Sequence, residues 1–597
     1  MKKQTLSRDY GIWKNLMKLF KNKLGYVILL MVFISLAGIL EASAPLAVRY
    51  FIDNFIIPKK IVGLQQPLIL LIFVILAASL STFIYMIAGG VLEYRLSYEL
   101  RNRAFIKLQN LNLEYFVKNP QGNIISRITS DITKLGEVIS WGIVDFTHSI
   151  ILAIFSISAM ILINFKLSLI AFGIIPVILV IVNFFQKKIL KQQRKTRMYN
   201  SNIVNAFNEN IVGIKTSKSL GIEGENCSEF YFLSSAMKRA SIKSSIFTAI
   251  FMFLVMFFAS VAASLSLHFS TVMVMNETMS YGSFIAFFTY TIQLLEPLRI
   301  ISQIISDMKS AQAASERVFS LLSEEIKIKD KEDVIMLYGD LFNPKKENYP
   351  DMTGSVEFKN VNFYYNKNEP LLKNFSLKVN AGQTVAIVGP TGAGKSTIVN
   401  LLCRFYEPVE GEILIDGKDY REYSMGYLHE NLGYVLQTPQ LFEGSIADNI
   451  RYGKENASFE EIVNAAKTVG AHDFIADLEK GYNTWIGGTD GISLSTGEKQ
   501  LLSFARAIIR KPKIFVLDEA TSSIDTEMER TVQKATDKVL KGNTGFVIAH
   551  RLSTITDADI IILVESGKIV ETGNHKELME KRGKYYELYS NRFLNIE

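Results

Sequence analysis

A glycine-rich run in the second half of the chain has the composition of a phosphate-binding loop. It follows an apolar, strand-like segment at 384–388, precedes an apolar helical pattern, and matches G-x-x-x-x-G-K-[ST]. Its backbone N–H groups can surround a phosphate chain, Lys395 can reach the β- and γ-phosphates, and Ser396 can offer a hydroxyl to Mg²⁺. We therefore predict a nucleoside triphosphate site. The residues of the run are Gly389, Pro390, Thr391, Gly392, Ala393, Gly394, Lys395, Ser396 and Thr397.

Two adjacent carboxylates offer the groups that hydrolysis of a triphosphate needs. Asp518 and Glu519 directly follow the apolar segment 514–517, which is typical of a buried strand. Asp518 can hold Mg²⁺, usually through water, and Glu519 can polarise the water that attacks the γ-phosphate. An apolar strand that ends in Asp-Glu is common on its own, so the pair indicates hydrolysis only together with the phosphate loop.

The elements around these groups indicate an α/β domain. Strand-like segments, of which the first spans 356–363, alternate with helical patterns to the end of the chain. We predict a nucleotide-binding domain over 355–597. The charged segment before it, 322–354, contains prolines and little periodicity, which predicts a linker.

The first half of the chain has the composition of a membrane domain. Of 597 residues, 49% are hydrophobic and 21% charged, mean hydropathy is +0.19, and almost all long uncharged runs precede Leu295. A bilayer core about 30 Å thick takes about 20 apolar helical residues, so we predict six spans within a domain over 25–321. The spans are about 26–48, 67–92, 141–165, 167–186, 245–275 and 278–295.

The basic residues predict how these spans are oriented. Lys and Arg cluster before the first span, after the second and after the fourth, where the long segments 93–136 and 187–243 follow. Since such clusters stay cytoplasmic, we expect both termini and the nucleotide-binding domain in the cytoplasm, below a cell (plasma or inner) membrane. The net charge of +7 then reflects membrane topology and does not indicate nucleic acid.

Apolar residues at helical spacing predict an interfacial helix over 1–24.

A further motif links the two halves to one family. Five residues some twenty positions before the acidic strand resemble the LSGGQ signature of ATP-binding cassette (ABC) transporters. The chain is similar over nearly its whole length to exporter-type half-transporters: a polytopic six-span α-helical membrane domain fused to a C-terminal α/β P-loop domain. Asp131 and the run 314–317 are also similar to exporter patterns. The signature residues are Leu494, Ser495, Thr496, Gly497 and Glu498.

The resemblance implies roles for further residues. Tyr365 stands where the family stacks an aromatic ring on adenine. Gln437 resembles the glutamine that touches Mg²⁺ and relays to the membrane domain, and His550 resembles the histidine that contacts the γ-phosphate. Ser523 and Asp525 look like part of the loop that crosses between paired cassettes.

The resemblance also implies a partner chain. In this family two cassettes enclose two ATP molecules, each between one phosphate loop and the other cassette's signature, and their closure and reopening switch the membrane cavity. The signature here departs from the family pattern at Thr496 and Glu498, whereas Asp518, Glu519 and His550 conform. We hypothesise a heterodimer with a second half-transporter, in which Glu519 serves one competent site. A homodimer that tolerates the altered signature stays open.

The substrate is indicated only in outline. Spans five and six are rich in aromatic residues, which suits a hydrophobic or amphipathic substrate but also ordinary packing. Glu41, an ionisable group within a span, could select cations, pair with a neighbouring helix or reach the membrane surface. We expect ATP-driven outward export of hydrophobic or drug-like compounds; lipid or peptide export, an ATP-gated channel and a regulatory subunit are alternatives. Candidate substrate residues are Glu41, Phe287, Tyr290 and Gln293.

Overall fold

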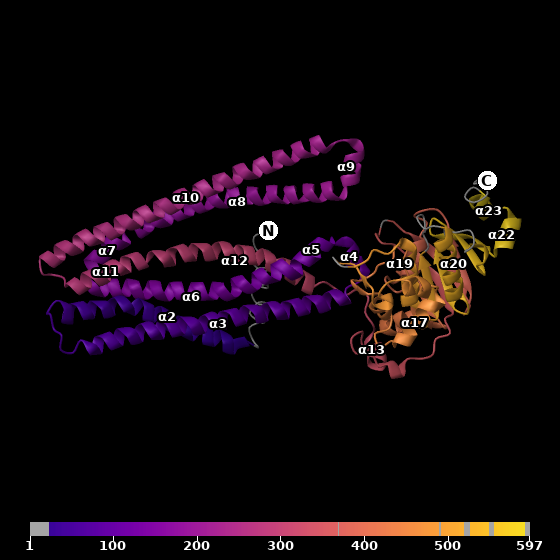
Figure 1. Ribbon diagram of the computed structural model, residues 1–597, viewed down its shortest axis with the longest axis horizontal. Helices are drawn as coiled ribbons and strands as arrows, with labels where there is room; N and C mark the ends of the chain where they lie inside the picture. The colour runs from indigo at the N-terminus through magenta and orange to yellow at the C-terminus, as the bar shows by residue number, and fades with distance from the viewer. Residues whose placement is uncertain (1–22, 368, 489–490, 519–525, 549–554, 591–597) are drawn as a thin grey trace. The chain divides into compact units, whose positions relative to one another are not determined.

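The computed structural model describes residues 23–367, 369–488, 491–518, 526–548 and 555–590 (Figure 1). They form two compact units, which we describe separately. The membrane unit contains residues 23–110 and 120–324. The nucleotide unit contains residues 111–119 and 325–590. The interfacial helix predicted over 1–24 lies outside the described residues except for its last two positions.

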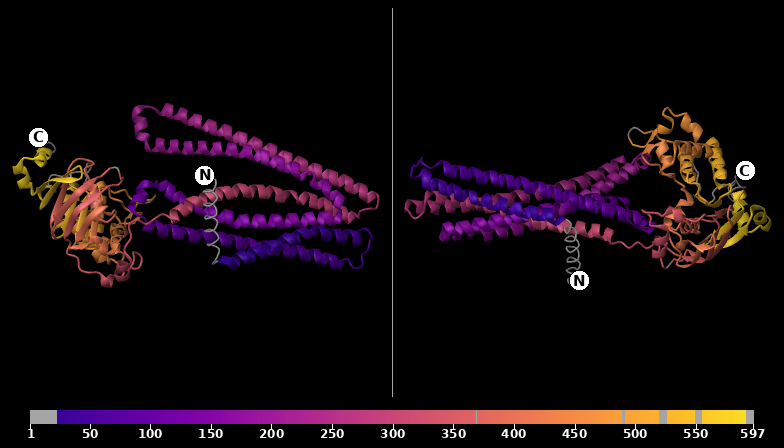
Figure 2. Two further views of the ribbon diagram at one scale, coloured as in Figure 1. Left: turned by 180° about the vertical axis from the view of Figure 1, so that it is seen from behind. Right: turned by 90° about the horizontal axis from the view of Figure 1, so that it is seen from below.

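The membrane unit is a set of long helices (Figures 1 and 2). Among the described residues, five helical stretches are long and apolar enough to cross a bilayer: Leu24–Ile56, Gln65–Asn110, Gln121–Ile163, Phe165–Val212 and Glu223–Met275. The individual elements are α2 (Leu24–Phe51), η2 (Ile52–Ile56), α3 (Gln65–Asn110), α5 (Gln121–Ser126), η3 (Arg127–Asp131), α6 (Ile132–Ile163), α7 (Phe165–Phe172), α8 (Ile175–Val212), α9 (Ile214–Leu220), α10 (Glu223–Met275), α11 (Tyr281–Gln293) and α12 (Leu295–Leu322).

The sixth predicted span is divided between two helices. We predicted one span over 278–295, but α11 has 13 residues and ends at Gln293, and α12 begins at Leu295. Pro297 explains the division, because it has no amide hydrogen to donate to the carbonyl of Gln293 four residues earlier. At 1.5 Å per residue α11 is about 20 Å long, which is too short to cross a bilayer without α12.

Several helices continue well beyond bilayer thickness. α8 has 38 residues and α10 has 53, so at 1.5 Å per residue they extend about 57 Å and about 80 Å. They pack against each other as a hairpin with the short α9 at its tip (Figure 1). The long extension predicted for 187–243 corresponds to this hairpin tip.

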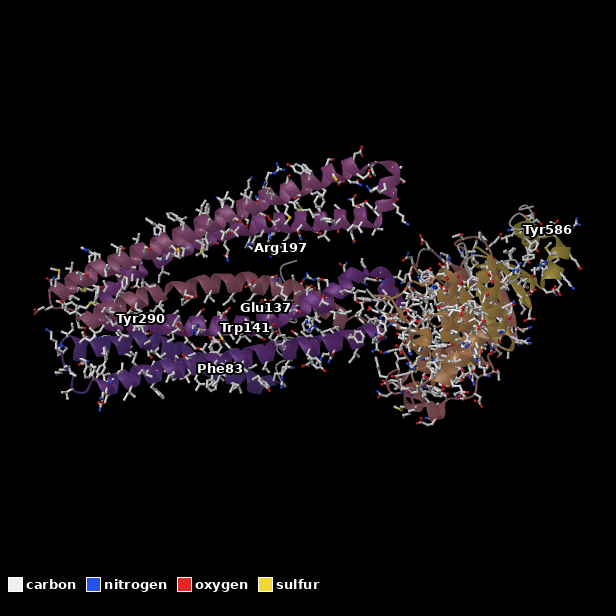
Figure 3. The ribbon with its side chains drawn as sticks, in the orientation of Figure 1. Phe83, Glu137, Trp141, Arg197, Tyr290 and Tyr586 are labelled. Atoms are coloured by element: carbon white, nitrogen blue, oxygen red, sulfur yellow. The ribbon has the colours of Figure 1, made fainter. Side chains whose placement is uncertain are left out.

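The surface of α3 is suited to lipid. Five large apolar side chains along it are between 59% and 65% exposed, and Figure 3 labels one of them, Phe83. Such a broad apolar surface is unfavourable in water but not in a bilayer. These side chains are Ile69, Phe73, Leu76, Leu80 and Phe83.

A buried carboxylate links η3 to α12 within this unit. Asp131, at the end of η3, is buried and accepts two hydrogen bonds from Arg317 of α12, at 2.7 Å and 2.6 Å. A bidentate pair of this kind fixes both position and orientation. It joins two of the segments that resemble exporter patterns.

The nucleotide unit is built on a six-stranded sheet in the order β12-β11-β3-β10-β9-β6, with four- and two-stranded sheets beside it. The five strands from β11 to β6 are parallel, and β12 pairs antiparallel to β11. The strands are β1 (Val356–Phe363), β2 (Leu372–Val379), β3 (Thr384–Val388), β4 (Glu410–Ile415), β5 (Lys418–Asp419), β6 (Leu432–Val435), β7 (Gly444–Ser445), β8 (Trp485–Ile486), β9 (Ile514–Asp518), β10 (Thr544–Ile548), β11 (Ile560–Glu565) and β12 (Lys568–Gly573).

Helices complete this unit and cover the sheet. Nearly every residue of β3, β9 and β10 is buried, as expected of parallel strands with both faces covered. The predicted α/β fold is confirmed. The helices are α4 (Leu113–Lys118), α13 (Glu332–Tyr338), η4 (Lys346–Asn348), α14 (Lys395–Leu402), η5 (Tyr420–Glu422), α15 (Met425–Glu430), α16 (Ile446–Arg451), α17 (Phe459–Thr468), α18 (His472–Ala476), η6 (Gly481–Asn483), α19 (Thr496–Ile508), α20 (Thr526–Leu540), α22 (His575–Lys581) and α23 (Lys584–Tyr589).

Much of the segment predicted as a linker, 322–354, is built into the nucleotide unit. Asp330 is buried and pairs with the buried guanidinium of Arg404 at 2.9 Å, and its second oxygen accepts the Met425 N–H at 3.0 Å. Lys327 pairs with Glu114 of α4 at 2.7 Å. These contacts join positions far apart in the sequence, so residue type and periodicity did not indicate them.

We predict that Arg404→Ala lowers the free energy of unfolding of the nucleotide unit by about 3 kcal/mol, because Asp330 would stay buried without its counter-charge. Thermal unfolding of the detergent-solubilised chain measures this loss. Arg421→Ala is the control. Its pair with Asp419 at 2.6 Å is partly exposed, so the expected loss is about 1 kcal/mol or less. Equal losses for the two variants would contradict the role given to the buried pair.

Candidate functional site

The sheet brings the predicted nucleotide residues to one edge. β3, β10, β9 and β6 run parallel, and their carboxyl ends lie within about one residue of each other in register. Ile548, the last residue of β10, pairs with Ile387, one residue before the end of β3, and with Asp518, the last residue of β9. The phosphate loop follows β3, Asp518 ends β9, and Gln437 comes two residues after β6. Because ligands of open α/β sheets bind at the carboxyl ends of strands, this edge is the candidate site.

Two glycines allow the phosphate loop its shape. Gly389 has φ +148°, and a Cβ there would lie 2.2 Å from the carbonyl oxygen of Val564. Gly394 has φ +106° and directly precedes α14. The loop can therefore place a phosphate chain at the N-terminus of α14, where free N–H groups and the helix dipole favour anions.

Charged and polar groups complete the loop. Lys395 Nζ donates hydrogen bonds to the carbonyl oxygens of Gly389 at 2.7 Å and Pro390 at 2.9 Å, which holds the ammonium group over the loop. A phosphate can replace these partners with stronger charge-assisted bonds. Ser396, Gln437 and Asp518 supply oxygen donors, the ligand type that Mg²⁺ prefers.

Tyr365 lies beside the loop with part of its ring available for a base. Its side chain is 44% exposed, its hydroxyl lies 3.3 Å from Thr397 Oγ1, and it accepts a hydrogen bond from Asn400 Nδ2 at 3.4 Å. The rings of Phe363 and Tyr406 contact it edge-on, each with a centroid distance of 5.0 Å. Tyr406 was not predicted, because an aromatic residue after an apolar helix is indistinguishable in sequence from ordinary core.

The signature forms the start of α19. Leu494 is buried, and Ser495 caps the helix: its hydroxyl accepts the Glu498 N–H at 3.3 Å, and Glu498 Oε2 accepts the Ser495 N–H at 2.7 Å. This is a capping box, in which Glu and Gln serve equally. Glu498 therefore forms the same helix start that the Gln of the family signature would form, and it differs from Gln by its negative charge. Thr496 is exposed in the first turn.

The predicted Glu519, Ser523, Asp525 and His550 lie outside the described residues. The strands before them end at Asp518 and Ile548, which are neighbours in register. Their predicted roles stay predictions.

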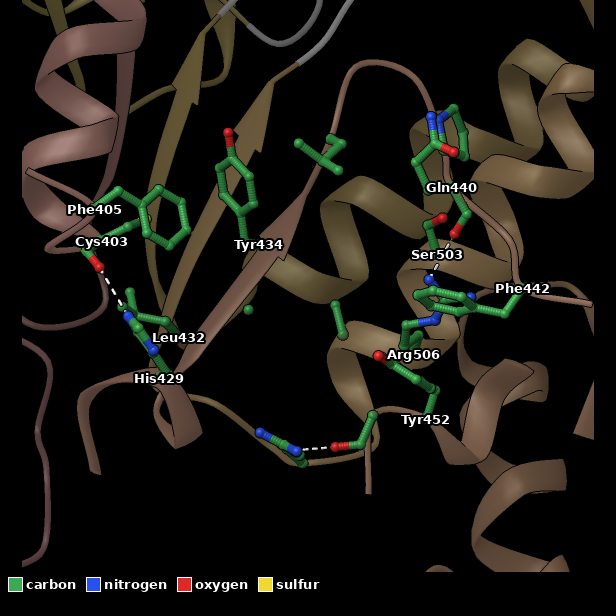
Figure 4. A pocket seen from close by; sticks show the side chains of 16 residues that line it. Cys403, Phe405, His429, Leu432, Tyr434, Gln440, Phe442, Tyr452, Ser503 and Arg506 are labelled. Atoms are coloured by element: carbon green, nitrogen blue, oxygen red, sulfur yellow. Dashed lines mark hydrogen bonds between the residues drawn. The ribbon is translucent and has the colours of Figure 1, made fainter. Parts of the chain in front are cut away.

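A groove of about 440 Å³ lies elsewhere on the nucleotide unit (Figure 4). The rings of Phe442 and Tyr452 stack at 4.2 Å on one side, and the Arg506 guanidinium lies over both. On the other side His429 Nε2–H donates to the Cys403 carbonyl at 3.0 Å; burial lowers the pKa of His429, which favours the neutral ring. The groove thus combines a largely apolar lining with fixed polar groups, and periodicity did not predict it.

The four candidate substrate residues separate into two environments. Glu41 and Gln293 line one cavity of about 470 Å³ in the membrane unit. Phe287 and Tyr290 are fully buried in a cluster with residues of α6 and α7. The structure thus brings together the two polar candidates and gives the two aromatic ones a packing role.

The chain belongs to the ABC transporter family. Residues 27–298 match the ABC transporter transmembrane region, and residues 372–522 match the ABC transporter domain. It is therefore an exporter-type half-transporter, an ATPase coupled to translocation across a membrane that it crosses several times, and it needs a second half to complete a dimer.

Curated relatives cover nearly the whole chain. The ABC transporter ATP-binding protein YfiC of Bacillus subtilis is 33% identical over 99% of this chain and 96% of its own length. An ATP-dependent lipid A-core flippase of Syntrophus aciditrophicus is 31% identical over 98% and 94%. A putative multidrug export ATP-binding/permease protein, YgaD of Bacillus subtilis, is 32% identical over 94% and 96%.

We predict that Tyr406→Leu weakens ATP binding about threefold to tenfold, because the Tyr365 ring loses its edge-on support. Titration of the purified protein with a fluorescent ATP analogue measures the change. Tyr406→Phe keeps the ring and is the matched control, with affinity within twofold of wild type. Equal affinity for the Leu variant and wild type would show that Tyr406 does not position Tyr365.

Proposed function

We propose that this chain exports hydrophobic or drug-like compounds from the cytoplasm or the inner leaflet of a cell membrane. The cavity between α2 and α11 carries this proposal, because most of its lining is apolar. The multidrug-type relative supports it. Lipid export is the nearest alternative, supported by the similarity to a lipid A-core flippase. The further alternatives are peptide export, an ATP-gated channel and a regulatory subunit.

The nucleotide unit and both termini face the cytoplasm in this proposal. The basic clusters at the ends of the predicted spans support this orientation, since such residues are retained on the cytoplasmic side.

ATP binds at the sheet edge in this proposal. The phosphate loop and Lys395 would hold the phosphates, and Tyr365 would stack on adenine. Ser396, Gln437 and Asp518 would hold Mg²⁺. The metal ion would neutralise charge on the β- and γ-phosphates. Glu519 polarises the attacking water.

We predict that Glu519→Gln abolishes sustained ATP hydrolysis while ATP binding stays within about twofold of wild type, because the amide cannot polarise water as a carboxylate does. Phosphate release and binding of a fluorescent ATP analogue measure the two properties. Glu527→Gln, an exposed change in the first turn of α20, is the control and should leave both unchanged. Hydrolysis by the Glu519 variant at the wild-type rate would contradict the assignment.

The second half of the dimer is a different half-transporter in this proposal. The signature of this chain covers the partner's ATP, and Glu498 adds a negative charge to that signature. Like charges at close range disfavour binding. Glu519 of this chain serves the other, competent site.

This chain purified without a partner should therefore hydrolyse ATP slowly. Thr496→Gly combined with Glu498→Gln should raise its rate at least about tenfold, since Gln keeps the capping box of α19 and removes the charge. Glu461→Gln is the matched control, because Glu461 forms the same capping box with Ser458 on α17. Robust ATPase activity of the unmodified chain alone would overturn the heterodimer proposal.

A further inference from the structure

The cavity in the membrane unit is lined by one face of each of two helices. α2 contributes Glu41 and Pro45, which are one turn apart, and α11 contributes Phe288, Thr289, Ile292 and Gln293, which recur at helical spacing. Apolar groups make up most of the lining, with Glu41, Thr289 and Gln293 as the polar side chains. A ligand here meets an apolar wall and a few polar points.

Glu41 is held in place with part of its carboxylate available. Its Oε2 lies 3.0 Å from His148 Nε2 of α6, and no hydrogen bond to Oε1 occurs within the described part of the chain. The side chain is 52% exposed. His148 therefore orients the carboxylate without enclosing it.

The basic residue of α2 already has an acidic partner. Arg49, two turns further along α2, is matched by Asp53 at 3.8 Å. Asp53 therefore offsets the positive charge of Arg49.

The other polar groups of the cavity are mainly acceptors. Gln293 Oε1 is buried and has no hydrogen-bond partner among the described residues. The Thr289 hydroxyl donates to the carbonyl oxygen of Ile285 at 2.8 Å, so lone pairs are what it can offer a ligand. Pro45 and Pro297 lie four residues after Glu41 and Gln293, so the carbonyls of both lack their usual intrahelical donor.

Two contacts hold the walls of the cavity at a fixed spacing. The Tyr290 hydroxyl of α11 donates to the Ala42 carbonyl of α2 at 2.5 Å; Figure 3 labels Tyr290 on its helix. Asp53 accepts from Gly282 N–H at 2.8 Å and from the Ser280 hydroxyl at 2.6 Å. The cavity is thus preformed, which lowers the cost of binding.

We propose that this cavity recognises amphipathic cations, with Glu41 receiving the ammonium group and the apolar wall receiving the rest of the molecule. The proposal rests on the proposed export function and narrows its substrate class. An ammonium group carries only donors, which matches the acceptors described. The negative charge of a phosphate or carboxylate headgroup would instead be repelled by the carboxylate of Glu41.

Three dansyl probes with a common hexyl chain test this in the purified dimer: an amine, charged at neutral pH, an alcohol and a carboxylate. Dansyl fluorescence measures binding. The amine should bind wild type at least about tenfold more tightly than the other two. Glu41→Gln should remove that preference with little change for the alcohol, and Gln293→Met should weaken amine binding about threefold. Glu277→Gln, an exposed change between α10 and α11, is the matched control and should keep the preference.

Equal binding of the three probes to wild type, or an undiminished preference in the Glu41 variant, overturns the inference. Stimulation of ATP hydrolysis separates it from the proposed function. If the alcohol stimulates hydrolysis equally in wild type and the Glu41 variant while the amine preference is lost, both proposals are supported. If no probe stimulates hydrolysis in wild type, the export of drug-like compounds is wrong, and the binding ratios still decide the cation site.

Discussion

The nucleotide unit depends on one constraint: parallel strands present their carboxyl ends at a single edge. β3, β10 and β9 are buried on both faces, and β6 pairs in parallel with β9 at the edge of the sheet, so hydrophobic packing fixes their register. That register sets the phosphate loop, Asp518 and Gln437 at one edge, although these positions are widely separated in sequence. The positions of the nucleotide-site residues therefore depend on the packing of the buried strands.

The membrane unit uses backbone interruptions in a comparable way. Pro45 and Pro297 have no amide hydrogen, so the backbone carbonyls of Glu41 and Gln293 each lose one helical hydrogen bond. Glu41 and Gln293 line the same cavity. Pro297 also divides the sixth span. In the low-dielectric interior of a membrane, freed carbonyls and a carboxylate require compensation, which His148 supplies in part and a cationic ligand would supply further.

Features that are local in sequence were predictable, and features made by tertiary contact were not. The phosphate loop, Asp518 and the altered signature could be identified because each is a short run with its own chemistry. The capping role of Glu498 follows from residues three apart. In contrast, the contacts of Glu41 with His148 and Arg404 with Asp330 join residues 107 and 74 positions apart. Tyr406 stayed hidden for the same reason, since its role appears only beside Tyr365.

Steady-state accumulation of a neutral dansyl probe in inside-out vesicles tests most directly whether the sheet edge drives transport through the membrane unit. Mg²⁺ and ATP should raise the internal concentration well above the external one, and a non-hydrolysable ATP analogue should not. Equal concentrations on both sides in the presence of ATP would indicate a channel or a regulatory subunit and would contradict ATP-driven transport.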